Sequence, residues 1–148
     1  MIASLAVVGK NNYPLYIRCF NGVDGSSDSI KFQYIIHASL DIVDEKLLPS
    51  KRSPAQQNAS IAADLFLGVL MASEEYRVYG YVTNSKVKLL LVVGDSVNQV
   101  DPRNFLKRVH RFLVESILNP FHVVDSPLTD CKRFDALVCQ EVEAIQGR

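Results

Sequence analysis

Residues 79–93 have the sequence YGYVTNSKVKLLLVV, and the rest of the chain can be understood outward from this stretch. Two segments rich in strand-forming residues flank Asn84-Ser85, a pair that favours a tight turn, and they predict a hairpin of strands over 76–83 and 86–93. Lysines alternate with apolar residues where the second strand begins, whereas residues 89–93 are apolar throughout. Alternation is typical of a strand with one face in water, and a continuous apolar run indicates cover on both faces. The sheet is therefore predicted to lie between layers of helices.

Three further strands are predicted ahead of this hairpin. Residues 2–9 and 14–20 are strand-like and are separated by Lys10-Asn11-Asn12-Tyr13, where asparagine favours the left-handed backbone of a turn. These two segments are expected to form an N-terminal hairpin. A third apolar segment, residues 65–71, leads into the central hairpin and brings the predicted sheet to five strands.

The first predicted helix follows a polar loop at residues 21–29, in which Asp28 or Ser29 is the expected N-cap. Its apolar residues recur at intervals of four, four, three and four, which places them in one stripe of a 3.6-residue helix. The stripe consists of Phe32, Ile36, Leu40, Val43 and Leu47. Pro49 is expected to end the helix, and residues 50–63 have the composition of a long exposed loop whose role stays open.

Two more helices are predicted after the central hairpin. Asp101 is the expected cap of the first of them, with Pro102 at its first position, where a missing amide hydrogen is harmless, and Asn119-Pro120 ends it. The last helix is predicted over residues 130–146. The two buried stripes are Leu106, Val109, Leu113 and Ile117, and then Phe134, Leu137 or Val138, Glu141 or Val142, and Ile145. The predicted order is two strands, one helix, three strands and two helices, in one domain spanning residues 1–148.

The composition is that of a globular domain without a strong field of either sign. Among the 148 residues, 48% are apolar, and Lys plus Arg equal Asp plus Glu at 16 each, for a formal net charge of +0. A nucleic-acid binder would carry a basic patch on a basic chain, so nucleic acid is not an expected partner. A chain without net charge associates more readily with itself or with partners, which leaves open a homodimer of the isolated chain.

Cysteine usage and the apolar runs indicate an intracellular protein outside the bilayer. Cys19, Cys131 and Cys139 do not have the number or spacing of zinc ligands, so we expect free thiols and no metal. The apolar run at residues 2–8 lacks the basic segment and the cleavage site of a signal peptide. Residues 89–93 are far shorter than the roughly 20 residues of a membrane span. We therefore expect a cytoplasmic protein with no stable insertion into a membrane.

Five separated blocks of the sequence resemble the sedlin family. They are YPLYIR at 13–18, SLDIVDEK at 39–46, YGYVTNSKVK at 79–88, Asn119-Pro120-Phe121 and Phe134-Asp135. The blocks follow one another in the order of the family and span nearly the whole chain. The resemblance implies a longin-like fold of the mixed α/β (α+β) class, in which a five-stranded, mostly antiparallel sheet has one helix on one face and two helices on the other.

The same resemblance implies an adaptor without chemistry of its own. Sedlin-type proteins are subunits of the TRAPP complex, an assembly that tethers transport vesicles and activates a Rab GTPase in transport between the endoplasmic reticulum and the Golgi. We therefore expect contacts with TRAPP core subunits, an indirect link to a Rab GTPase, no cofactor, and a peripheral position at both membranes through the complex. The alternative is a free-standing longin-type regulator of a SNARE or a small GTPase.

The candidate contact residues lie on the solvent side of the first predicted helix: His37, Asp41, Asp44 and Glu45. Asp41 is the leading candidate because it lies in the block at 39–46 that resembles the family. Acidic residues near a helix C-terminus oppose the helix dipole, and a cation on a partner can offset that cost. His37 and Asp41 are four residues apart and face each other, as a surface pair or, with a third ligand, as metal ligands; the surface pair is favoured.

Two other groups of residues have catalytic or charged side chains, but no sequence motif supports a site there. Ser96 and His110 are residue types of a hydrolase, which is a remote alternative because Ser96 is not in the strained turn of a nucleophile elbow. Lys107, Arg108 and Arg111 form a basic cluster around His110. Such a cluster is usually a solvated face, and it also suits contact with anionic lipid or an acidic partner.

Overall fold

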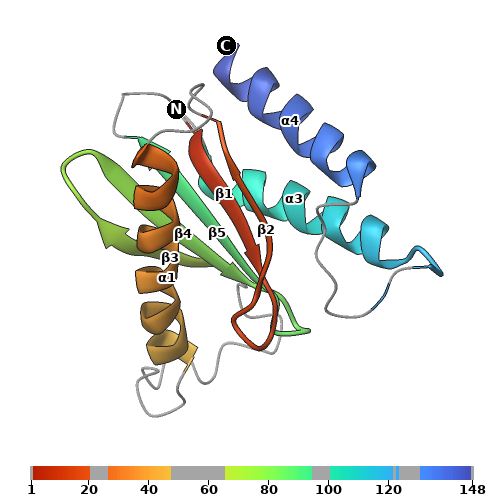
Figure 1. Cartoon of the computed structure of the whole chain (residues 1–148), viewed down its shortest axis with the longest axis horizontal. Helices are drawn as coiled ribbons and strands as arrows, with labels where there is room; N and C mark the ends of the chain where they lie inside the picture. Colours follow the sequence, from red (N-terminus) through yellow and green to blue (C-terminus); the bar gives the residue numbers. More distant parts are fainter. Residues whose placement is uncertain are drawn as a thin grey trace.

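The computed structural model describes residues 2–20, 27–47, 66–94, 101–121, 123 and 131–147. The elements follow the predicted order (Figure 1). They are β1 (Ile2–Val8), β2 (Pro14–Cys19), α1 (Ser27–Leu47), β3 (Phe66–Ala72), β4 (Tyr76–Val82), β5 (Lys88–Gly94), α3 (Pro102–Ile117) and α4 (Lys132–Gln146). The loop at 50–63 and Ser96 lie outside the described residues.

The five strands form one sheet in the order β2-β1-β5-β4-β3. All four neighbouring pairs are antiparallel. The central strand is β5, the strand whose apolar run predicted cover on both faces, and Leu89 to Val92 are all fully buried. The N-terminal hairpin joins the rest of the sheet where β1 pairs with β5.

Helices cover both faces of the sheet, as predicted. Figure 1 shows α1 on one face and α3 with α4 on the other. Alternate residues of β5 divide between the two cores: Leu90 and Val92 pack with the α1 stripe, whereas Leu89 and Leu91 pack with α3 and α4. The longin-like architecture expected from the family resemblance is therefore the observed one.

Three local predictions are wrong. Ile117, expected in the buried stripe of its helix, is the last residue of α3 and is 42% exposed, because a periodic pattern does not report where the covering surface ends. Helix α1 begins at Ser27, so Asp28 and Ser29 lie inside its first turn and neither is the cap; small polar and acidic residues suit the cap and the first turn alike, and composition does not separate the two positions. The turn after β4 is longer than Asn84-Ser85. Thr83 N donates to Val87 O at 2.9 Å, which leaves a three-residue loop closed by Lys86 at φ 68, the left-handed position that such loops require.

The start of α3 agrees with the sequence. Asp101 Oδ1 accepts from Arg103 N at 3.1 Å and from Asn104 N at 3.4 Å, and Pro102 occupies the first helical position. Two amide groups that would otherwise lack a partner are thereby satisfied. The cap therefore fixes where α3 begins.

Candidate protein-interaction site

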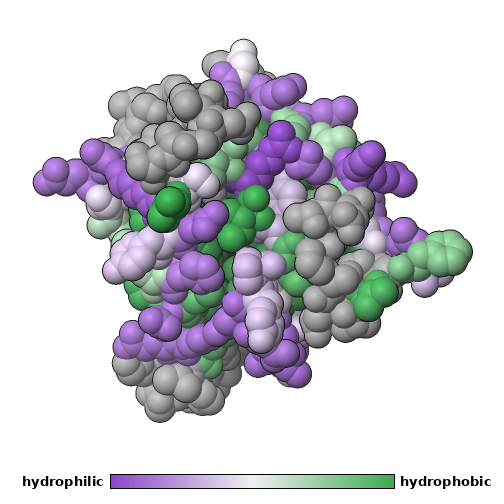
Figure 2. Space-filling model, viewed as in Figure 1, coloured by the Kyte–Doolittle hydropathy of each residue, from purple (hydrophilic) through white to green (hydrophobic). Residues whose placement is uncertain are grey.

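Helix α1 has a continuous exposed side opposite its buried stripe. Residues at intervals of four, three, four and four share this side, which we call the α1 outer face: Ile30, Tyr34, His37, Asp41 and Glu45. Ile30 and Tyr34 are 72% and 74% exposed although both are large and apolar or aromatic. Figure 2 shows this side of the molecule, where the mostly hydrophilic surface over the helix is interrupted by apolar side chains.

Three of the five residues of this face were predicted from the sequence. His37, Asp41 and Glu45 are exposed on it, whereas Ile30 and Tyr34 were missed. The missed signal is their spacing, because both fall outside the buried stripe and continue the His37 and Asp41 side toward the helix N-terminus. The face therefore combines an apolar half with an acidic half.

Asp44 belongs to a different contact, which is made within the chain. The ammonium of Lys88, whose side chain is only 6% exposed, donates to Asp44 Oδ1 at 2.7 Å and to Asn12 Oδ1 at 2.5 Å. Asn12 Nδ2 in turn donates to Asp44 Oδ2 at 3.4 Å. A buried charge must be paired and hydrogen-bonded. Asp44 thus ties α1 to the start of β5 and to the β1–β2 turn, and its role in a partner contact stays a prediction.

The end of α1 also shields an edge of the sheet. Lys46 Nζ donates to Val69 O at 3.0 Å and to Leu67 O at 3.4 Å on the outer strand β3. Edge carbonyls are open to pairing with another chain, and a lysine over them reduces that tendency. A cation in the last turn also interacts favourably with the helix dipole. Asp41, one turn earlier, has no ion pair within the described part of the chain.

Two of the family-like blocks meet on the other side of the sheet. Tyr16 Oη donates to Asp135 Oδ1 at 2.6 Å, and the guanidinium of Arg18 pairs with Asp135 Oδ2. The hydrogen bond from Arg18, supported by that from Tyr16, lowers the pKa of Asp135, whereas burial and then the bond to Asp135 raise the pKa of Tyr16. These contacts fasten α4 to β2, so the blocks at 13–18 and 134–135 have a structural role here.

His110 is packed and hydrogen-bonded within the fold. Its Nδ1 lies 3.2 Å from Tyr81 Oη, and burial lowers the pKa of the imidazole. The two rings are 5.4 Å apart between centroids. The contact with Tyr81 therefore gives His110 a structural role. Ser96, the other residue of the hydrolase hypothesis, lies outside the described residues.

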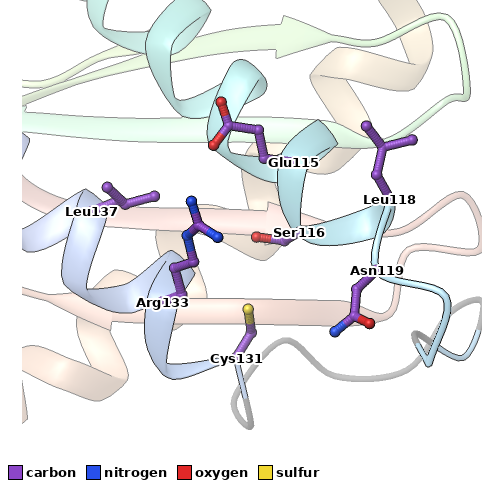
Figure 3. A pocket seen from close by; sticks show the side chains of 7 residues that line it. All are labelled: Glu115, Ser116, Leu118, Asn119, Cys131, Arg133 and Leu137. Carbon is purple, nitrogen blue, oxygen red and sulfur yellow. The ribbon is translucent and has the colours of Figure 1, made fainter.

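A pocket of about 360 Å³ opens between the end of α3 and the start of α4 (Figure 3). Cys131 lines it together with Glu115 and Arg133, and none of the seven lining residues is a histidine. Among these seven lining residues there is therefore no cysteine–histidine pair of the kind that activates many catalytic thiols. Cys19, Cys131 and Cys139 are all free thiols, as expected.

The described residues include neither a metal-binding cluster nor a membrane-spanning helix. No group of three His, Cys, Asp or Glu there is arranged to hold a metal, and that includes the surroundings of His37 and Asp41. Among the helices of that same part of the chain, none has the length and apolarity to pass through a bilayer. The candidate site is therefore the α1 outer face, which is exposed and carries both apolar and acidic side chains.

The chain is similar over most of its length to one family of known proteins. The model of the family described as Sedlin matches residues 7–144. Curated proteins called "Trafficking protein particle complex subunit 2-like protein" are 37% identical over 141 residues in Xenopus tropicalis and 36% identical over 135 residues in Dictyostelium discoideum. These alignments cover 93% of the chain and 94% of the Xenopus protein, and 90% of each chain for Dictyostelium. The chain therefore belongs to the sedlin family.

Proposed function

We propose that this chain is a non-enzymatic adaptor subunit of a TRAPP complex, acting in vesicle tethering and in transport between the endoplasmic reticulum and the Golgi. The names of its relatives support a role in the trafficking protein particle, and the alignments run over nearly their whole length. The observation that carries the adaptor role is the α1 outer face, because Ile30 and Tyr34 are large, exposed and one helical turn apart, as in a surface that binds another protein.

The contact proposed for a TRAPP core subunit uses both halves of the α1 outer face. Ile30 and Tyr34 supply apolar area, and an aromatic residue is a frequent anchor of an interface. Asp41 supplies a negative charge without an ion pair in the described part of the chain. The matching surface is apolar, with a lysine or arginine opposite Asp41, and this charge gives the contact its orientation and specificity.

The wider role follows from membership in such a complex. The adaptor supports assembly of a complex that activates a Rab GTPase, and it reaches the membranes of the endoplasmic reticulum and the Golgi as a cytoplasmic, peripheral component. No residue of this chain is assigned a step in nucleotide exchange. His37 and Glu45, at the border of the acidic half, contribute to the rim of the contact.

Capture from cell extract tests the adaptor role. Tagged wild-type protein is expected to retain several TRAPP core subunits, identified by mass spectrometry, whereas Asp41→Tyr and the double variant I30S/Y34S lose most of them. The matched control is Glu143→Tyr, which places the same aromatic residue at an exposed position of α4. Circular dichroism and thermal unfolding show whether each variant is folded.

The outcome separates three possibilities. Loss of TRAPP subunits in both α1 variants but not in Glu143→Tyr supports the proposal. If all variants still capture TRAPP subunits, the contact lies on another surface of the protein. A wild-type chain that captures a SNARE or a small GTPase but no TRAPP subunit contradicts the adaptor role and favours the free-standing longin regulator.

A further inference from the structure

We propose that the exposed side of α3, together with the segment that follows it, is a contact surface for an anionic membrane. This side, the α3 outer face, consists of Arg103, Lys107, Arg111, Val114 and Leu118, and Phe121 and Val123 continue it. The inference does not depend on the proposed TRAPP contact, which uses the helix on the opposite face of the sheet.

Helical geometry places the members of the α3 outer face in one line. Their spacing of four, four, three and four residues keeps them on the same side, while Phe105, Leu106, Val109 and Leu113 face the sheet. The first half of the line is cationic, and Arg111 has a side chain that is 80% exposed. The second half is apolar and ends at the C-terminus of the helix.

The apolar end is unusually open to solvent. Leu118 is 74% exposed, Phe121 is 90% exposed and Val123 is 69% exposed, and all three follow within a few residues of the helix end. Figure 2 shows apolar side chains projecting from the molecule at the end where α3 finishes in Figure 1. A single exposed leucine needs no explanation, but three exposed large apolar side chains within six residues indicate an interaction surface.

The charges of α3 suit a negative surface. The helix carries four basic residues and one acidic residue. Arg108 is directed to Glu141 of α4 at 2.9 Å, and Glu115 lies 3.6 Å from Arg111, so Arg111 is partly compensated. Lys107 has no ion pair within the described residues. On the opposite face of the sheet α1 carries Asp41, Asp44 and Glu45.

This separation of charge orients the molecule. An anionic membrane attracts the α3 side and repels the acidic end of α1, so the α1 outer face points away from the bilayer and stays open to a protein partner. By sequence α3 has four basic residues and one acidic residue, whereas α1 has four acidic residues and two basic ones. Basic residues followed by Leu and Phe are also the composition of helices that lie in a membrane interface.

A membrane fits these residues better than an acidic protein does. Phe121 is 90% exposed just after the basic helix, where a side chain can insert among lipid headgroups. A few cations and two or three apolar side chains give weak, reversible binding, since stable anchoring needs a second signal. Such binding suits a subunit that is held at the membrane mainly by its complex.

Vesicle flotation tests the inference with the full chain. Wild-type protein is mixed with vesicles of phosphatidylcholine alone or with about one third phosphatidylserine, at low and high salt. We expect binding to the anionic vesicles at least about tenfold above the neutral ones at low salt, reduced by high salt. The variants K107Q/R111Q and L118S/F121S should each lose about tenfold, because the first removes headgroup attraction and the second removes insertion.

Matched controls remove the same chemistry elsewhere. K10Q/K86Q neutralises two exposed lysines in the turns of the sheet, and I30S/Y34S removes exposed apolar area from α1. Both should bind anionic vesicles within about twofold of wild type. The proposal is overturned if wild type does not bind anionic vesicles, or if these controls lose as much binding as the α3 variants. It is equally overturned if the α3 variants keep vesicle binding but lose a captured protein, which would identify a protein contact.

Discussion

On the α1 side of the sheet the buried ring of Phe32 meets Tyr76 edge to face, with ring centroids 5.2 Å apart. On the other side Phe134 of α4 meets Tyr16 in the same geometry at 5.1 Å. Edge-to-face contact adds to the stabilisation that burial provides. Both layers are therefore attached to the sheet through an equivalent aromatic pair.

The charged links of the two layers differ. Lys88 is almost completely buried at the end of α1, whereas Arg18 and Asp135 at α4 have side chains that are 42% and 37% exposed. A buried charge is expensive to leave unpaired, and a solvated pair contributes little. The outer faces differ as well, since one is apolar and acidic and the other is basic and apolar. The inner surfaces of the two layers are thus built alike, whereas their outer surfaces differ in charge and in exposed apolar residues.

The aromatic pairs provide the largest expected effect. Phe32→Ala and Phe134→Ala should each lower the free energy of unfolding by about 3–5 kcal/mol, because each leaves a cavity in a fully buried site. Urea denaturation followed by circular dichroism measures the change. Ile30→Ala, at an exposed position of α1, is the control and should change stability by less than about 0.5 kcal/mol. A large loss for only one of the two phenylalanines would show that one helix layer is not part of the cooperative unit.

The Asp44–Lys88 link should respond differently according to which partner is removed. Asp44→Ala leaves a buried ammonium with Asn12 as its remaining partner and should cost about 2 kcal/mol, less than a fully buried pair because Asp44 is half exposed. Lys88→Met should cost less than about 1 kcal/mol, since the remaining carboxylate stays hydrated. Thermal unfolding of both variants gives the order. The reverse order would mean that Lys88 is not effectively buried.

The Arg18–Asp135 link should appear as a small pH dependence. The pKa of Asp135 is lowered in the folded protein, chiefly by the hydrogen bond from Arg18. The associated stability is present above the ordinary carboxyl pKa and is lost as pH falls below about 4 through the folded pKa. Wild type should therefore lose up to about 1 kcal/mol more than Asp135→Asn between about pH 6 and pH 3. Tyr16→Phe should keep most of this dependence, and identical profiles for wild type and Asp135→Asn would disprove the link.

The outer face of α1 should affect stability least. Asp41→Tyr and I30S/Y34S are expected to change the free energy of unfolding by less than about 0.5 kcal/mol, because these side chains are exposed and Asp41 has no ion pair in the described residues. Urea titration of the purified variants checks this. A loss as large as that of Asp44→Ala would give the face a structural role and remove the basis for treating it as a binding surface.

Periodicity predicted the helices and the sandwich well, and it failed where distant residues meet. The α1 stripe, the Asp101 cap and the double cover of β5 all followed from local sequence. The Asp44–Lys88 and Tyr16–Asp135 contacts join residues 44 and 119 positions apart, which no local pattern reports. Their place outside the apolar stripe and in the family-like block at 39–46 therefore put Asp41 and Asp44 in one candidate site, and the structure shows that Asp44 is engaged by Lys88 within the chain.

Site-specific photo-crosslinking from position 34 tests whether a TRAPP core subunit covers the α1 outer face. A benzophenone side chain at this position of the α1 outer face, introduced in cells, reacts with whatever covers the helix, and the same probe at Glu143 of α4 serves as the control. We predict a crosslink from position 34 to a TRAPP core subunit. Asp41→Tyr should abolish this crosslink, and the probe at position 143 should give none. Co-purification of the intact complex without any such crosslink from position 34 would contradict it.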